Sequence, residues 1–278
     1  MRFKDNVRFF LAKVFFRETV LFSKKDDWEW HIRNKIKVYC PRFVPFFYEF
    51  NEINPDLFDL VIPVTIPAQR YINEHLDHLK GQKVINPSND AIDLCDDKET
   101  FTNILIKNGF ADYIPKTNEY VCYPYILKKK IGAWGKDITV IKDDECELAH
   151  IKEIESDDYF RQEYIKGEDE YTTHIIIYNK EVIFCKTLKF TFDETYFVKG
   201  QNFKHISKVE VDHNHHKILF ENILNALEYQ GICCFNYKLY EDKVKIFEIN
   251  PRYGGSMTDF INEALISYRD ILKKSKRV

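Results

Sequence analysis

Residues 244–256, VKIFEINPRYGGS, form the most informative stretch of this 278-residue chain. The apolar residues at its start are typical of a buried strand, in which alternate side chains share one face. On this pattern one face would carry Val244, Ile246, Glu248 and Asn250. Two oxygen-bearing side chains at the end of a buried strand suit a hard cation such as Mg²⁺. The alternative is a structural hairpin with a charged end.

The residues directly after this strand add to the signal for an anion site. Pro251 ends the strand, and Arg252 follows it as a fixed positive charge. Gly254 and Gly255 would let the backbone approach an anion, because glycine has no side chain in the way. Glycine is scarce in this chain, with 9 of 278 residues, so its clustering is informative.

The preceding predicted strand, CCFNYKLY, offers Asn236 as a third polar group. Asn236 would lie opposite Glu248 if the connecting turn has an odd length and is centred on Asp242. With that register, we expect Asn236, Glu248 and Asn250 to converge.

Two further stretches have patterns typical of nucleotide binding. In residues 123–137, YPYILKKKIGAWGKD, Lys128 lies on a predicted strand that leads into a turn with Gly132 and Gly135, a combination suited to phosphate oxygens. In residues 160–173, FRQEYIKGEDEYTT, extended backbone could contact an adenine edge, and Glu170 could accept from ribose hydroxyls. The alternatives are an exposed hairpin and an ordinary edge strand.

Taken in order, these motifs resemble the ATP-grasp superfamily, which includes D-alanine–D-alanine ligase, biotin carboxylase and the large chain of carbamoyl-phosphate synthetase. The resemblance covers about residues 60–265, and EINPR followed by Gly-Gly is its most specific part. It implies an α/β protein, α+β in its C-terminal part. An N-terminal α/β layer (1–92) would precede an ATP-grasp domain (93–278), with a central lobe at about 97–162 and a C-terminal lobe at about 163–278.

The resemblance also implies roles for individual residues around ATP and Mg²⁺. Lys98 and Lys128 would hold the phosphates under the loop between Gly132 and Gly135. The backbone of Glu163 and Ile165 would bind adenine beside Gln162, with Glu170 on the ribose. Glu248, Asn250 and Asn236 would bind Mg²⁺, although the neutral Asn236 stands where the family usually has Asp, Glu or Gln. Arg252 would lie near the reacting anion, with Lys186 or Lys189 as a further active-site cation.

The implied activity is an ATP- and Mg²⁺-dependent ligase that joins a small-molecule carboxylate to an amine or thiol through an acyl-phosphate. Phosphoryl transfer needs charge neutralisation more than acid–base groups, which suits a site of lysines, glycines and Mg²⁺ ligands. The alternatives are a small-molecule kinase of the same superfamily and a non-catalytic nucleotide-binding module.

Composition limits the other function classes. The 41 basic and 44 acidic residues leave a formal net charge of −3, which argues against a nucleic-acid partner. The seven cysteines form no C-x-x-C pair, and Lys13 interrupts what would be the apolar part of a leader. We therefore expect a cytoplasmic protein, and the sequence does not indicate an oligomeric state.

The N-terminal segment, residues 1–20, has its own pattern. Val7, Phe10, Leu11, Val14 and Phe15 recur with the period of one helix face, and basic residues lie between them. Two interpretations remain: a helix docked on the protein body, or a helix in peripheral contact with an anionic membrane. Membrane contact would fit a role in building the envelope or surface polysaccharide.

The remaining pattern predicts a strand–helix–strand unit and a series of hairpins. Strands are expected at 60–64 and 83–86, with Thr65 capping the helix between them. Further helices are expected at about 98–107, 217–229 and 257–273, and hairpin turns at 179–180 and 241–242.

Overall fold

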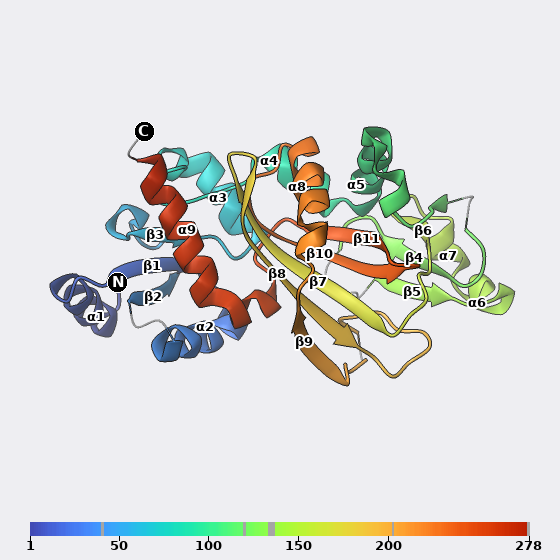
Figure 1. Cartoon of the computed structure of the whole chain (residues 1–278), viewed down its shortest axis with the longest axis horizontal. Helices are drawn as coiled ribbons and strands as arrows, with labels where there is room; N and C mark the ends of the chain where they lie inside the picture. Colours follow the sequence, from blue (N-terminus) through green and yellow to red (C-terminus); the bar gives the residue numbers. More distant parts are fainter. Residues whose placement is uncertain (40–41, 119–120, 133–136, 202, 277–278) are drawn as a thin grey trace.

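The computed structural model describes residues 1–39, 42–118, 121–132, 137–201 and 203–276, which form three sheets with helices around them (Figure 1). The strands are β1 (Glu18–Ser23), β2 (Phe43–Tyr48), β3 (Leu60–Ile62), β4 (Tyr125–Lys129), β5 (Ile138–Ile141), β6 (Tyr159–Glu163), β7 (Asp169–Tyr178), β8 (Glu181–Thr191), β9 (Ser207–Val211), β10 (Gly231–Tyr240) and β11 (Lys243–Asn250). The α-helices are α1 (Phe3–Val14), α2 (Asp26–Tyr39), α3 (Ile66–His75), α4 (Asn89–Asp96), α5 (Lys98–Leu105), α6 (Asp144–Ala149), α7 (Ile151–Ile154), α8 (Lys217–Ala226) and α9 (Ile261–Ser275).

The N-terminal sheet is parallel, with the order β2–β1–β3. Its helix α3 begins as predicted, because the Thr65 hydroxyl accepts from the Ala68 amide. The expected strand at 83–86 is wrong. These residues run beside β3, and the Val61 amide donates to the Lys83 carbonyl. The Ile85 amide, however, donates to the Tyr268 hydroxyl of α9, and not to the backbone of a strand.

The central sheet is antiparallel, with the order β11–β10–β7–β8–β9. Its predicted hairpin turns at 179–180 and 241–242 are confirmed, and both central residues of each turn have positive φ. Helices α4, α5 and α8 contribute to the core on one face of this sheet, and α9 contributes to the core that meets β8. A third sheet, β5–β4–β6, lies at the opposite end of the molecule from β1–β3 (Figure 1).

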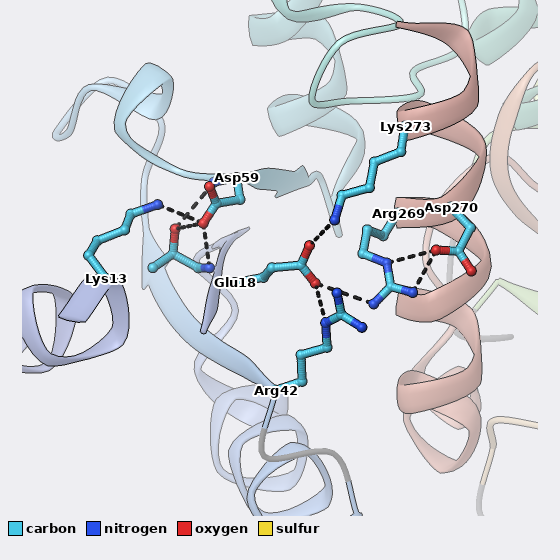
Figure 2. Close-up of polar contacts among 8 residues, drawn as sticks. Lys13, Glu18, Arg42, Asp59, Arg269, Asp270 and Lys273 are labelled. Atoms are coloured by element: carbon cyan, nitrogen blue, oxygen red, sulfur yellow. Dashed lines mark hydrogen bonds and ion pairs between the residues drawn. The ribbon is translucent and has the colours of Figure 1, made fainter. Parts of the chain in front are cut away.

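Helix α9 ties the C-terminal end of the chain to the N-terminal sheet. Its Tyr268 hydroxyl accepts from the Ile85 amide at 2.5 Å. Its Arg269 and Lys273 contact the Glu18 carboxylate of β1 at 3.3 and 2.5 Å, and Arg42 contacts the same group at 2.9 Å (Figure 2). The largest hydrophobic core therefore contains residues from both sides of the predicted domain boundary at residue 92.

Helix α1 docks on the N-terminal sheet, but not through the face that its apolar periodicity predicts. The docked side chains are Asp5, Phe9 and Ala12. Of the periodic residues, Phe10 is 67% exposed and Val14 49% exposed. No helix of the described residues is long and apolar enough to cross a membrane.

We predict that Tyr268→Phe lowers the free energy of unfolding by about 1–3 kcal/mol, because it leaves the buried Ile85 amide without its partner. Urea unfolding of wild type and variant measures this. Tyr240→Phe is the matched control, since Tyr240 is 46% exposed and should change stability little. Equal stability of the two variants would contradict the role of Tyr268 in joining α9 to the N-terminal sheet.

Candidate active site

A cleft lies between the β5–β4–β6 sheet and the end of the central sheet formed by β7, β10 and β11. It encloses about 910 Å³ not filled by protein atoms, part of it open to solvent. Ten of the residues predicted for the site line it: Lys98, Lys128, Gly132, Gln162, Glu163, Ile165, Glu170, Asn236, Glu248 and Asn250.

Two lysines line this cleft together with the Glu248 carboxylate. Lys98 is the first residue of α5, which Asp97 caps. Its Nζ donates to the Gly132 carbonyl at 2.7 Å and lies 3.9 Å from Glu248 Oε2. Lys128 on β4 is 3% exposed and donates to the Phe247 carbonyl at 3.0 Å. Burial lowers the pKa of Lys128 to about 7, with a smaller contribution from Lys98, and Glu248 opposes the shift.

Glu248 enters the cleft because β11 contains a bulge. The two-residue turn pairs Tyr240 with Lys243, and a register shift near Phe247 then brings Glu248 opposite Asn236. The predicted convergence is therefore present, but through a bulge instead of an odd-length turn. The prediction of one shared face is wrong, because Val244 and Ile246 point into the core with Ile249.

Glu248 is held as a carboxylate. Its Oε1 accepts from the Asn236 and Asn250 side-chain amides, each at 2.9 Å. Burial alone would raise the pKa of Glu248, but Lys98, Lys128 and these two amides outweigh burial and lower it.

The donor set around Glu248 fits Mg²⁺ only together with oxygens of a ligand. In the described part of the chain, no group of three or more His, Cys, Asp and Glu side chains could hold a metal. One carboxylate flanked by amide groups is a usual protein share of a Mg²⁺ site that also uses substrate phosphates.

Gln162 on β6 presents an unused polar group in the cleft. It is 2% exposed, and its Nε2 has no hydrogen-bond partner in the described structure. Nearby, the Glu163 amide donates to the Lys116 carbonyl, and the Ile165 carbonyl accepts from Lys238 at 3.1 Å. A buried donor without a partner is costly, which indicates that a ligand completes this end of the cleft.

Lys199 and Lys238 are charged cleft residues that sequence reasoning missed, and Lys199 has the more extensive polar contacts. Its Nζ contacts Glu170 Oε1 at 2.9 Å, Thr172 Oγ1 at 2.5 Å and Asn236 Oδ1 at 3.3 Å. It lies between β8 and β9, where no motif marks it. The sequence feature around Lys199 is a stretch rich in aromatic residues, 190–203, which does not by itself indicate a binding residue.

Three of the described residues that were predicted for the site, Lys186, Lys189 and Arg252, do not line the cleft. Lys186 pairs with Glu210 and Glu263, and Lys189 pairs with Asp169, so both are directed elsewhere. Arg252 contacts the cleft residue Asn250, donating to its Oδ1 at 3.1 Å. Gly135 lies outside the described residues.

Comparison with known proteins agrees with this architecture. Residues 95–256 match the family model of the ATP-grasp domain. A Mycoplasma genitalium protein named as the uncharacterized glycosyltransferase MG025 is 27% identical over 166 residues. The match covers 57% of this chain and 50% of that protein, so the chain spans about half the length of this relative.

Two solved structures show the likeness in fold. D-alanine–D-alanine ligase from Bacillus anthracis complexed with ATP superposes with a TM-score of 0.60 at 14% identity, covering 94% of this chain and 97% of that one. N5-carboxyaminoimidazole synthetase from Staphylococcus aureus complexed with ADP gives 0.60 at 15% identity, covering 87% and 73%.

The low pKa of Lys128 predicts a pH dependence of stability. Between pH 7 and about 10 the unfolded chain keeps the Lys128 proton and the folded chain releases it. The free energy of unfolding contributed by this group therefore rises with pH, by at most about 1.4 kcal/mol per pH unit. We expect Lys128→Met to reduce this slope in urea unfolding between pH 7 and 10. An unchanged slope would show that the Lys128 pKa is ordinary.

Proposed function

This chain belongs to the ATP-grasp family, and from that premise we propose that it binds ATP with Mg²⁺ in the cleft and acts as a carboxylate–amine or carboxylate–thiol ligase on small molecules. The observation that carries the proposal is the meeting of Lys98, Lys128 and Glu248 in one cleft. Two ammonium groups and one carboxylate suit a triphosphate and its counterion.

We assign the phosphate end of ATP to Lys98 and Lys128. Both ammonium groups are now satisfied by carbonyls, Gly132 for Lys98 and Phe247 for Lys128, and both carbonyl partners line the cleft. Phosphate oxygens would be stronger acceptors for these groups. Binding would also raise the pKa of Lys128, since a nearby negative charge favours the protonated form.

We assign the adenine end to Gln162 with the backbone of Glu163 and Ile165. The unpartnered Nε2 of Gln162 supports this assignment, because a base nitrogen would supply its missing acceptor. Glu170 would accept from the ribose, and its Oε1 already accepts from Lys199. Lys199 thus joins the nucleotide end of the cleft to Asn236.

Glu248, Asn250 and Asn236 would hold Mg²⁺ together with phosphate oxygens. The cation would neutralise charge on the phosphate oxygens during transfer. Both amides donate to Glu248 in this structure, so their oxygens would have to turn toward the cation.

The proposed reaction has two steps. A carboxylate oxygen of the first substrate attacks the γ-phosphorus, and ADP leaves. The amine or thiol then attacks the acyl carbon, loses its proton, and inorganic phosphate leaves. We propose Lys199, in place of Lys186 or Lys189, as the further cation of this site, with Arg252 positioning Asn250.

One observation favours a second candidate, a non-catalytic nucleotide-binding module. Asn236 leaves Glu248 as the single carboxylate among the three proposed metal-binding residues. We also propose that the protein lies in the cytoplasm and serves envelope or surface-polysaccharide metabolism.

We predict that Lys128→Ala weakens ATP binding at least tenfold, because one charge-assisted phosphate contact is worth about 1.5–3 kcal/mol. Isothermal titration with ATP and Mg²⁺ measures this. Lys152→Ala, on the exposed surface of α7, is the matched control and should bind like wild type. Equal affinity of both variants would remove Lys128 from the phosphate site.

Glu248→Gln should abolish turnover and the effect of Mg²⁺ on ATP affinity, because an amide is a much weaker ligand than a carboxylate. Mass spectrometry of metabolite pools supplied with ATP identifies the product. An amide or thioester with free phosphate indicates the ligase, and a phosphorylated acceptor indicates the kinase. ATP that binds but is never consumed by wild type, whatever the pool, would favour the non-catalytic module.

A further inference from the structure

Helix α1 turns its apolar face away from the protein. The side chains of Phe3, Val7, Phe10, Leu11 and Val14, here called the apolar stripe, are between 44% and 80% exposed. At 100° per residue these positions gather on one side of the helix, opposite Asp5, Phe9 and Ala12. Phe15 and Phe16 extend the exposed apolar surface past the end of the helix, at 68% and 94% exposure.

The opposite face of α1 is fixed to the N-terminal sheet. The Tyr48 hydroxyl donates to the Asp5 carboxylate at 2.6 Å, and Asp5 is 5% exposed. The Phe9 ring packs edge-on against Phe46 and Phe58, with centroids 5.8 and 5.4 Å away. These contacts hold the apolar stripe outward, so its exposure follows from the packing of the helix.

The segment that carries the stripe is net positive, and one of its basic side chains, Lys13, is paired with the Asp59 carboxylate at 2.7 Å. Residues 1–17 contain five basic side chains and one acidic side chain, which is the buried and paired Asp5. The basic residues are Arg2, Lys4, Arg8, Lys13 and Arg17. A second copy of the chain would bring the same positive charges against these, whereas anionic lipid headgroups complement them.

We propose that α1 lies in the surface of an anionic lipid bilayer, with the apolar stripe at the boundary of headgroups and acyl chains. An apolar face of aromatic residues flanked by Lys and Arg is typical of interfacial helices. Figure 1 shows α1 at one end of the long axis and the β5–β4–β6 sheet at the other. A bilayer at α1 therefore leaves the cleft in water. The proposal rests on α1 alone and is independent of the proposed reaction.

Vesicle co-sedimentation of the full chain tests this. We expect binding to vesicles of phosphatidylcholine mixed with phosphatidylglycerol, weaker binding at higher salt, and little binding to phosphatidylcholine alone. The double variant Phe3→Ser/Phe10→Ser should lower the partition coefficient at least tenfold, because it removes two inserted aromatic side chains. Ile218→Ser is the matched control, since Ile218 on α8 is 69% exposed and should not affect binding.

Two charge-reversal variants, one on α1 and one as a control on α7, complete the test. Lys4→Glu should weaken binding to the anionic vesicles several-fold, whereas Lys152→Glu on α7 should not. All four variants change exposed side chains, so unchanged urea unfolding confirms that each is folded.

No binding of wild type to anionic vesicles at low salt would overturn the proposal. A dimer in sedimentation velocity that Phe3→Ser/Phe10→Ser dissociates would also overturn it, in favour of a second copy. The affinity for ATP is measured separately. Loss of ATP binding would count against the proposed function, whereas loss of vesicle binding would count against membrane contact.

Discussion

Two lysines and one glutamate share a largely buried space in the cleft, and their charges have to balance there. Charges removed from water are costly unless they are paired and hydrogen-bonded. Burial is the main cause of the low pKa of Lys128, Lys98 adds to it, and Glu248 offsets it only in part. The cleft can be stabilised further by an anion, which would restore full charge to Lys128. The phosphates of the nucleotide that we propose for this cleft would supply such an anion.

The charges balance only if three separate elements bring Lys98, Lys128 and Glu248 into the same cleft. Lys98 begins α5, Lys128 lies on β4, and Glu248 follows the bulge of β11. A bulge is a suitable device here, because one extra residue turns Glu248 out of the core while Val244 and Ile246 stay inside it. At the other end of the molecule, α9 joins the N-terminal sheet through Tyr268 and the Glu18 cluster, so the two ends of the chain share one core.

The parts of the fold that sequence predicts are those with local signals. The Thr65 cap and the hairpin turns follow from turn and capping chemistry near each position. The parallel sheet β2–β1–β3 has no such signal, and its strands β1 and β2 are absent from our sequence-based predictions. The strand at 83–86 fails because a side chain from α9, far away in sequence, takes its hydrogen bond. In the cleft, motifs find Lys98, Lys128 and Glu248. Lys199 has no motif, because its position depends on a long connection between β8 and β9 and on contacts with Glu170 and Asn236.

Gly254 shows that a motif residue can be required for a different reason from the one its pattern suggests. The sequence indicates a backbone that approaches an anion, but a Cβ at Gly254 would lie 2.7 Å from the His174 ring and 3.0 Å from Cys234 Sγ. His174 is fully buried, and its Nε2 bonds to Ser256 Oγ at 2.8 Å. Burial lowers the pKa of His174 to about 3, so the ring is neutral and acts as a packing and hydrogen-bonding partner. The glycine thus lets the segment after β11 pass closely over His174 of β7 and Cys234 of β10. In this chain Gly254 of the Gly-Gly motif therefore serves close packing.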